Sequence, residues 1–444
     1  MVLINTKILF QGKLISAGIA IENGKIIKIA KDSNLPSASK IINLNGHITL
    51  PGLIDSHVHL RDQLLAYKED FITGTSAAAV GGVTLVMDMP NNKPVTMDSF
   101  ALKKRMKIAE KKILVNTAFY SAFPKNLDEI EKIVKAGAIG FKIYLSNKIG
   151  GIDIEDDQLL LEAFRRAANE GVPVAVHAED YKILTKIQKQ IKNKERNETT
   201  DYMQAHPPEA EITSIQRILP IIKNSGVHVH FCHISSAKGL KVIMNAKKIG
   251  LPVTLEVTPH NLFLTCEEYN RSGTIALTDP PLRTQEDISA LWSALKKGSI
   301  DIIASDHAPH DLKEKKVDSI WDVKSGIPGL ETTFPLLLTQ VNKGRLLLSD
   351  VIKFTATIPA KIFHLKKRGC IAEGNWADLV VVDMKREYNI DSSLFFSKAK
   401  YSPFDGMHIK GMPIKTFVNG NLIMDSGKIV AKPGNGLVIT NDLF

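Results

Sequence analysis

The segment Pro51-Gly-Leu-Ile-Asp-Ser-His-Val-His-Leu-Arg-Asp62 carries two histidines, one residue apart, at the end of an apolar run. Side chains alternate between faces in an extended strand, so His57 and His59 point the same way and can bind one metal ion together. Arg61 occupies the next position on that face, which indicates a metal centre acting on something anionic. Histidines on a strand are more often hydrogen-bonded core or surface residues, so the interpretation depends on the rest of the chain.

Further buried-looking runs follow this segment. They span 82–88, 113–118, 138–144, 172–177, 227–233, 252–257 and 302–306. Amphipathic stretches such as 156–169 and 235–248, with apolar residues at helical spacing, lie between most of them. Together with the opening run these make eight strands alternating mostly with helices. The pattern predicts an α/β fold, a parallel (β/α)8 TIM-like barrel.

The two ends of the chain have a different pattern, with short strands and tight turns. Runs at 7–10, 19–21 and 25–29 include an Asn23-Gly24 turn, and runs at 377–383, 414–418 and 421–424 include Asn419-Gly420. We therefore predict a small β-sandwich domain built from both termini. The predicted boundaries are 1–50 and 366–444 for its two parts, and 51–365 for the barrel.

Composition narrows the class of protein. The formal net charge is +10 and the sequence pI about 9.2, but the basic residues are spread along the chain, which favours a lysine-rich surface over nucleic-acid binding. The basic segment 182–200 is interpreted as a surface helix or loop. Three separate cysteines form no CxxC pair, which indicates a reducing compartment. No signal-peptide pattern or apolar run of membrane-spanning length occurs, so we expect a cytoplasmic protein that does not bind membranes.

The active site of such a barrel forms at the carboxyl ends of its strands, and metal-competent residues occur at several of those ends. They are His57, His59, Lys142, His177, His233 and Asp306. Each has an alternative explanation: a strand-terminal histidine is often only hydrogen-bonded, and Asp306 could cap a helix. Their occurrence on so many separate strands predicts a shared metal site.

Four histidines and a carboxylate suit zinc. A lysine amine is a poor ligand, but as a carbamate Lys142 would be an anionic oxygen donor able to bridge two metals; a salt-bridged barrel lysine is the alternative. Two metals can activate a bridging water as hydroxide and polarise a carbonyl. Asp306 would then move a proton from that hydroxide to the leaving nitrogen.

Three motifs identify the chain as similar to the cyclic-amide hydrolases of the amidohydrolase superfamily, which include dihydroorotases, allantoinases and dihydropyrimidinases. They are Ser305-Asp-His-Ala-Pro-His310, Glu256-Val-Thr-Pro-His-Asn-Leu262, and His57-Val-His-Leu-Arg-Asp62 paired with Met89-Pro-Asn91. All three resemble dihydroorotases in particular. The resemblance covers nearly the whole chain, including Gly369-Cys-Ile-Ala-Glu-Gly374 near its end.

The resemblance implies roles for individual residues. The six strand-end residues would be ligands of two zinc ions bridged by carboxylated Lys142, with Asp306 also the catalytic acid and base. Arg61, Asn91 and His310 match the residues that hold the substrate carboxylate, and Ser325-Gly326 match a backbone segment that contacts the pyrimidine ring. A guanidinium, an amide and an imidazole converging on a carboxylate discriminate against uncharged analogues.

Two positions depart from relatives. Asp279-Pro-Pro-Leu-Arg283 stands where the family usually has Asn-Pro-Pro-Leu-Arg, so the expected substrate contact of Asp279 would be water-mediated or made by a neutral carboxyl. Lys142 is kept where many bacterial relatives lack a lysine, which favours the carbamate. His206, His228 and His230 are interpreted as strand or surface histidines rather than ligands.

The resemblance therefore implies a dihydroorotase, which reversibly closes N-carbamoyl-L-aspartate to dihydroorotate in pyrimidine synthesis. The alternative is an allantoinase or hydantoinase with the same metal site; a non-enzymatic scaffold is disfavoured because no ligand is missing. The expected partners are a small anionic substrate and a second copy in a homodimer, with docking on aspartate transcarbamoylase, as in some relatives, a further option.

Overall fold

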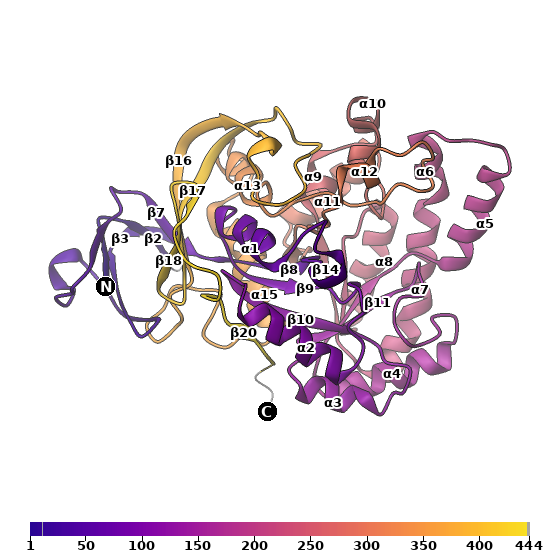
Figure 1. Cartoon of the computed structure of the whole chain (residues 1–444), viewed down its shortest axis with the longest axis horizontal. Coiled ribbons are helices and arrows are strands. Elements are labelled where there is room, and N and C mark those ends of the chain that lie inside the picture. Colours follow the sequence, from indigo (N-terminus) through magenta and orange to yellow (C-terminus); the bar gives the residue numbers. More distant parts are fainter. Residues whose placement is uncertain (11, 442–444) are drawn as a thin grey trace.

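Eight parallel strands form the centre of the molecule, each hydrogen-bonded to the next in chain order. This computed structural model describes residues 1–10 and 12–441 (Figure 1). The strands are β8 (Leu53–Val58), β9 (Val83–Asp88), β10 (Asn116–Ala122), β11 (Gly140–Tyr144), β12 (Val174–His177), β13 (Val229–Phe231), β14 (Val253–Val257) and β15 (Ile302–Ile303). A parallel bridge between Val58 and His307 brings the first strand beside the last and nearly closes the ring. The predicted barrel is confirmed.

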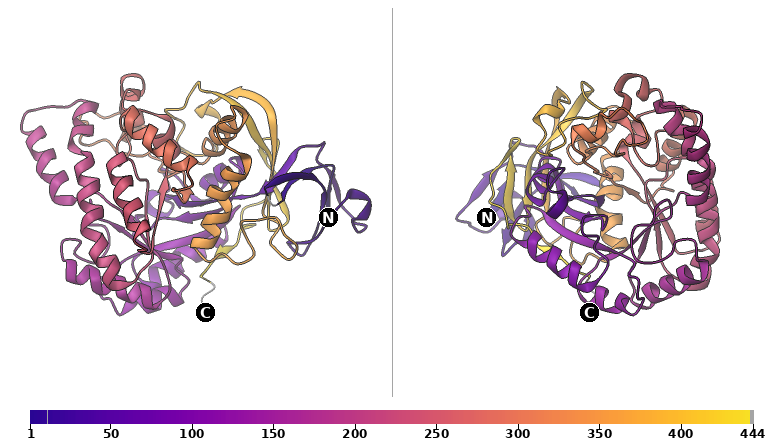
Figure 2. Two further views of the ribbon diagram at one scale, coloured as in Figure 1. Left: turned by 180° about the vertical axis from the view of Figure 1, so that it is seen from behind. Right: turned by 45° about the vertical axis from the view of Figure 1, so that its right-hand side comes forward.

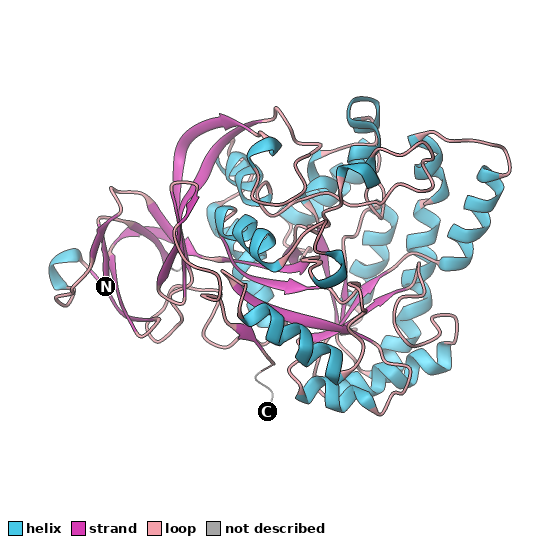
Figure 3. Cartoon of the chain, viewed as in Figure 1, coloured by secondary structure: helices cyan, strands magenta, loops and turns pink. Residues whose placement is uncertain are grey.

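Helices cover the outside of these strands, as the colouring by secondary structure shows (Figure 3). The larger ones are α1 (Phe71–Val80), α2 (Ser99–Glu110), α3 (Glu129–Lys135), α4 (Asp157–Asn169), α5 (Tyr181–Lys192), α7 (Pro208–Ser225), α8 (Ala237–Lys248), α11 (Gln285–Lys296) and α13 (Thr333–Asn342). Short helices are α6 (Thr199–Ala205), α9 (Pro259–Phe263), α10 (Glu268–Ser272), α12 (Leu312–Lys315), α14 (Leu348–Ile352) and α15 (Ile358–Ile362). Two helices begin where the sequence predicts, because the Asp156 and Ser236 side chains accept hydrogen bonds from their first-turn amides.

Two barrel strands differ in extent from the predicted runs. The run at 113–118 continues to Ala122, and β10 begins only at Asn116 because the Ile113 carbonyl accepts hydrogen bonds from Gly434 and Gly436 instead of a barrel neighbour. The run at 302–306 leaves the ladder after Ile303, and Asp306 has a positive φ of 46°. The short last strand therefore releases Asp306 onto the rim of the barrel.

Strands from both ends of the chain form two sheets beside the barrel, as predicted (Figure 2). The four-stranded sheet contains β1 (Val2–Ile4), β4 (Gly18–Glu22), β5 (Lys25–Ala30) and β6 (Ile41–Asn43). The seven-stranded sheet contains β2 (Lys7–Phe10), β3 (Lys13–Ser16), β7 (Ile48–Pro51), β16 (Leu379–Asn389), β17 (His408–Val418), β18 (Asn421–Asp425) and β19 (Lys428–Ile429). The pairing of β7 with β16 joins the two ends.

Strand β16 attaches this β domain to the barrel through its two faces. Leu379 and Val381 pack into the core between the two sheets, whereas Val380 and Val382 belong to the large core of the barrel. The alternation follows from the two-residue period of a strand. Both faces of β16 are therefore buried, and the β domain is packed firmly onto the barrel.

The chain returns to the barrel after the β domain. Strand β20 (Val438–Ile439) pairs in parallel with β10, a contact that the sequence did not predict. Across residues 1–10 and 12–441, every helix falls short of the length or apolarity needed to cross a lipid bilayer.

Candidate active site

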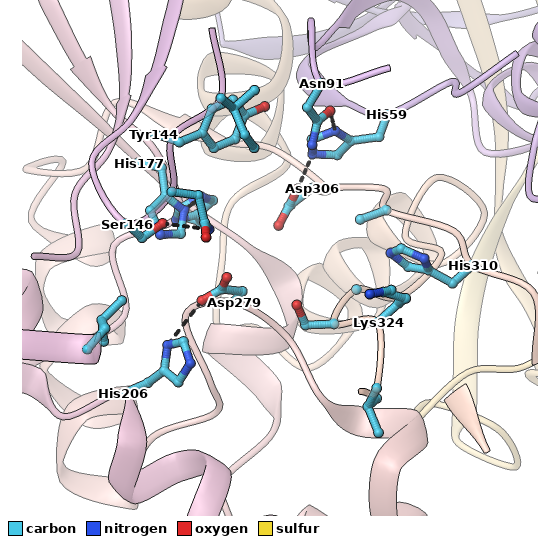
Figure 4. A pocket seen from close by; sticks show the side chains of 18 of the residues that line it. His59, Asn91, Tyr144, Ser146, His177, His206, Asp279, Asp306, His310 and Lys324 are labelled. Carbon is cyan, nitrogen blue, oxygen red and sulfur yellow. Dashed lines mark hydrogen bonds and ion pairs between the residues drawn. The ribbon is translucent and has the colours of Figure 1, made fainter. Parts of the chain in front are cut away.

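A cavity of about 570 Å³ opens at the carboxyl ends of the barrel strands (Figure 4). All the site residues predicted from the sequence line it except Lys142, which lies fully buried beneath it. The lining includes His57, His59, Arg61, Asn91, His177, His233, Asp279, Asp306, His310, Ser325 and Gly326. Residues from the two halves of the chain thus meet in one place, where the rule for barrel enzymes puts the chemistry.

The first group of candidate ligands consists of His57, His59 and Asp306. The Nε2 atoms of His57 and His59 lie 3.3 and 3.1 Å from the same Asp306 Oδ1. Their Nδ1 atoms face acceptors, Glu256 Oε1 at 2.5 Å and Asn91 Oδ1 at 2.7 Å, so the ring protons belong there. Two nitrogen lone pairs and a carboxylate oxygen therefore converge, which is the arrangement that a metal cation satisfies.

The electrostatics of this group favour a bound positive charge. Burial and Lys142 lower the pKa of His57, but the Glu256 and Asp306 carboxylates raise it more, to about 10. Burial raises the pKa of Asp306, but His57 and His59 lower it by more, so the pKa lies well below its usual value. Asp306 is thus a carboxylate, and the position between it and the histidines attracts a proton or a metal ion.

The second group consists of His177 and His233. His177 Nε2 donates to Glu179 Oε2 over 3.0 Å, which leaves the lone pair of its Nδ1 facing His233 Nε2 at 3.1 Å. Burial and the neighbouring His177 hold the pKa of His233 well below its usual value, so that ring is neutral. The two ring nitrogens pointed at each other also fit a shared metal ion.

Lys142 lies beneath the cavity, close enough to both groups for its charge to act on each. Its Nζ is 2.9 Å from Cys232 Sγ and 4.9 Å from the centre of the Tyr144 ring, and its charge lowers the pKa of both His57 and His233. A positively charged lysine next to the ligands repels a metal cation. The Lys142 side chain therefore suits the site only when it no longer carries a positive charge. The donor set of imidazoles and carboxylate fits zinc without further residues.

Glu256 holds the candidate ligands in place. It belongs to one of the family motifs, but the sequence analysis assigned it no role. Its fully buried carboxylate contacts His57 Nδ1, His230 Nε2 at 3.0 Å and the backbone amide of His233 at 3.2 Å. Burial raises the pKa of Glu256, but His57 and His230 lower it more, to well below its usual value. One carboxylate therefore orients a ligand of each group. His230 is a buried residue of strand β13, as the sequence interpretation of a strand histidine expects, and its Nε2 contacts this carboxylate.

We expect Glu256→Gln to weaken zinc binding by about 10- to 100-fold, the usual cost of losing a carboxylate behind a metal-bound histidine. The measurement is zinc retained per chain during titration with a chelator. Glu331→Gln is the matched control, because within the described residues, 1–10 and 12–441, that carboxylate accepts hydrogen bonds only from the amides of Phe396 and Ser397. Equal zinc retention in the two variants would contradict the role of Glu256.

Backbone strain coincides with these side chains. His233, Asp306 and Arg61 have positive φ values of 35°, 46° and 54°, a region that costs a non-glycine residue about 1–3 kcal/mol. Asp62 next to Arg61 stabilises the strained turn by accepting hydrogen bonds from the Gln63 and Phe71 amides. The strained backbone lowers the stability of the fold but orients these side chains toward the cavity.

One side of the cavity, next to the first group of ligands, carries a buried arginine. Arg61 is 7% exposed, its Nε donates to the Pro309 carbonyl, and its second terminal nitrogen lies 3.1 Å from His310 Nε2. Asn91 lies between this side and the ligands through its contact with His59. Arg61 and His310 are therefore in contact with each other, Asn91 contacts a ligand of the first group, and all three predicted carboxylate-binding residues line the same cavity.

Asp279 faces the cavity beside His206, which corrects the interpretation of His206 as a surface histidine. His206 is 8% exposed, and its Nδ1 lies 3.3 Å from Asp279 Oδ1 and 3.4 Å from Glu179 Oε1 (Figure 4). Burial lowers the pKa of His206, but Glu179 and Asp279 raise it more, to about 10. The imidazolium, together with Arg283 at 4.0 Å from Glu179, balances the two carboxylates.

Ser325 and Gly326 bring backbone to the cavity wall. Gly326 has a φ of 133°, and a Cβ there would lie 2.5 Å from the Ala308 carbonyl oxygen, so only glycine fits. Its amide donates to the Leu277 carbonyl over 2.8 Å, and the buried Lys315 amino group donates to the carbonyls of both Leu277 and Gly326. Lys315 thus ties this segment to the loop that carries Asp279.

Several lining residues were missed by the sequence prediction. Helix α5 lies in the basic segment interpreted as a surface helix or loop; its lysines face outward, while Leu184, Thr185 and Gln188 line the cavity. Glu179 could have been noticed because it follows His177 at the same two-residue spacing as His57 and His59. Cys232 and Tyr144 gave no signal in the sequence, although both contact Lys142 and Tyr144 also lines the cavity.

Comparisons with known proteins agree with this geometry. A model of the amidohydrolase family matches residues 48–423. Dihydroorotases of Methanothermobacter thermautotrophicus and Pyrococcus horikoshii are 38% and 39% identical, over 96% of this chain and 94% and 93% of theirs. The solved structure of an L-hydantoinase (dihydropyrimidinase) from Arthrobacter aurescens has a TM-score of 0.95 and 34% identity, and covers 99% of both chains.

Proposed function

This chain belongs to the amidohydrolase family, and from that membership we propose that it is a zinc-dependent dihydroorotase. The reaction is the reversible closure of N-carbamoyl-L-aspartate to dihydroorotate in pyrimidine synthesis. The observation that carries the proposal is the cationic side of the cavity, where Arg61 and His310 stand beside the candidate metal ligands. A ring that bears a carboxylate suits this site, because charge-assisted hydrogen bonds reward it and a neutral ring leaves the donors unpaired.

We propose that the site holds two zinc ions bridged by carboxylated Lys142. His57, His59 and Asp306 would hold one, and His177 and His233 the other. The influence of Lys142 on a histidine of each group supports this, because a carbamate would replace an opposing positive charge with oxygen donors. When bound, zinc supplies an activated water and polarises the carbonyl.

The chain's own residues then have distinct tasks. Asp306, a carboxylate facing the cavity, accepts a proton at its carboxylate oxygen from the attacking water and delivers it to the departing ring nitrogen. Arg61, Asn91 and His310 hold the substrate carboxylate and so fix the ring amide over the ligands. The backbone at Ser325 and Gly326 contacts the ring, and Asp279, paired with the His206 imidazolium, meets its polar edge.

The L-hydantoinase relative makes a neutral cyclic amide the competing substrate class. We expect turnover of dihydroorotate, with kcat/KM at least about a hundredfold above that for dihydrouracil, hydantoin or allantoin, because two charge-assisted hydrogen bonds are missing in those rings. The assay is accompanied by zinc analysis of the same preparation. Turnover of allantoin or dihydrouracil without dihydroorotate would replace this proposal with the alternative.

The small-molecule substrate follows from the family. The homodimer and the docking on aspartate transcarbamoylase, expected from the resemblance alone, stay predictions.

A further inference from the structure

Tyr144 is the last residue of β11, two residues beyond Lys142, so both side chains lie on the same face of the strand, inside the barrel. The Lys142 Nζ lies 4.9 Å from the centre of the Tyr144 ring, and the centre of the His177 ring lies 6.2 Å from it. The Tyr144 side chain also lines the cavity (Figure 4). It therefore belongs to the cavity wall beside the candidate metal ligands.

The Tyr144 hydroxyl has no hydrogen-bond partner among residues 1–10 and 12–441, although its oxygen is buried and the residue is only 6% exposed. Buried polar groups are hydrogen-bonded in the great majority of cases, so this exception needs an explanation. Burial, Cys232 and Asp306 hold the pKa of the hydroxyl well above its usual value although Arg61 opposes them, so the group keeps its proton. It is therefore a hydrogen-bond donor at the cavity wall for which the described part of the chain supplies no acceptor.

Arg61 is a second group in the cavity wall whose bonding is incomplete. Within residues 1–10 and 12–441 its guanidinium contacts the Pro309 carbonyl and His310, and no carboxylate lies within ion-pair distance of it. A buried charge is normally paired, because an isolated one is costly. Burial lowers the pKa of Arg61, whereas Tyr144 and then Asp306 raise it, so the Tyr144 hydroxyl lies within electrostatic reach of the guanidinium. One anionic group could therefore serve both.

Asn91 adds a third donor on this side. Figure 4 places Tyr144 on the same side of the cavity as Asn91, across from Asp279. The Asn91 Oδ1 accepts from His59 Nδ1, which leaves the amide N–H groups of Asn91 as donors. A carboxylate has about four lone-pair positions and a negative charge, so one carboxylate can accept from a guanidinium, an amide and a hydroxyl together. A neutral carbonyl has fewer lone pairs and cannot balance the charge of the guanidinium.

We propose that the Tyr144 hydroxyl donates a hydrogen bond to the substrate carboxylate, beside Arg61 and Asn91, and so helps to select acidic rings. This rests on the proposed function, since it assumes a substrate that carries a carboxylate. The same ligand group then completes the bonding of the buried hydroxyl and of the buried guanidinium. A neutral ring brings no such acceptor and leaves both donors desolvated, which costs affinity.

The test compares Tyr144→Phe with Tyr120→Phe. Tyr120 is the matched control, because it is a buried barrel tyrosine whose hydroxyl donates to the Ser56 carbonyl over 3.2 Å and which does not line the cavity. The probes are orotate, a planar ring with the carboxylate, and uracil, the same ring without it. We expect Tyr144→Phe to raise the Kd of orotate, measured by calorimetry, about tenfold, the usual effect of losing a hydrogen bond to a charged group. Tyr120→Phe should keep that Kd within about threefold, and uracil should displace a ligand equally well from all three proteins.

The second readout is kinetic. Tyr144→Phe should raise KM for dihydroorotate about tenfold and change kcat less than about threefold, because the contact with the carboxylate is the same before and during the reaction. A fall of kcat with an unchanged KM would place the hydroxyl at the reacting carbonyl and overturn the proposal. Equal losses of affinity for orotate and uracil would place it on the ring, and they overturn the proposal as well.

Thermal unfolding supplies a readout without any ligand. Tyr144→Phe should unfold at or above the wild-type temperature, because its hydroxyl has no bond within the described chain to lose, whereas Tyr120→Phe should unfold at a lower temperature. A Tyr144→Phe protein that is less stable than the wild type would show that the hydroxyl is bonded within the protein, against the proposal. A wild type that does not turn over dihydroorotate would refute the proposed function. A wild type that does, with an unchanged Kd of orotate in Tyr144→Phe, would refute only the role of Tyr144.

Discussion

Asp306→Asn should lower kcat by at least about a thousandfold while leaving most of the bound zinc in place. The physical reason is that the amide keeps an oxygen near the two histidine nitrogens but can no longer take up and release a proton. General acid–base catalysis is worth about 10²- to 10⁴-fold, and the carboxylate also contributes charge to the site. Steady-state kinetics in both directions and zinc analysis of the same sample measure the two effects separately.

Asp311→Asn is the matched control for Asp306. Its carboxylate accepts a hydrogen bond from the Lys313 amide at the start of α12 and does not line the cavity. That variant should keep kcat within about threefold, because only a helix cap is weakened. If Asp306→Asn kept its zinc and lost less than tenfold in kcat, another group would have to move the proton.

Lys142→Ala should lose zinc and about a thousandfold or more in kcat. A metal contributes several kcal/mol of transition-state stabilisation, and each 1.36 kcal/mol is a factor of ten in rate. The variant also leaves space where the side chain was, so a short carboxylic acid added to the buffer should restore part of the activity by supplying bridging oxygens. The measurement is zinc per chain and kcat, with and without the added acid.

Lys315→Met provides the comparison for removal of a buried lysine. Lys315 is as buried as Lys142, but it binds backbone carbonyls of the substrate loops, so its loss should change KM and leave zinc in place. Carboxylation of Lys142 itself is tested by incubating the native enzyme with ¹³C-labelled bicarbonate and recording the ¹³C carbamate signal. Full zinc content in Lys142→Ala, with no such signal in the wild type, would refute the bridging role.

The specificity side of the cavity is organised by charge pairs. Arg61 and His310 contact each other at the cavity wall, and Lys68 and Glu314 stand behind them. On the other side, His206 neutralises the Asp279 carboxylate that replaces the family's usual asparagine. An anionic substrate can therefore approach Asp279 without meeting an uncompensated negative charge.

The sequence by itself determined the barrel and the residues at its rim. Each barrel strand is a short apolar run, and most candidate ligands lie at or just beyond the end of their own run, so periodicity and position were sufficient to find His57, His177 and Asp306. The bounds of two strands were less well predicted. Strand β10 begins late because a distant segment hydrogen-bonds to the residue before it, and β15 ends early, ahead of the strained residue Asp306.

Only the tertiary structure decided how the site is supported. Glu256 meets His57, Lys68 meets His310 and His206 meets Asp279 across gaps of tens to hundreds of residues, and no local pattern links the partners. That the candidate ligands meet can be predicted from the strand order, because closing the barrel brings every strand end to one rim. Tautomers, charge balance and the position of Lys142 depend on side-chain contacts inside that rim, which exist only once the chain has folded.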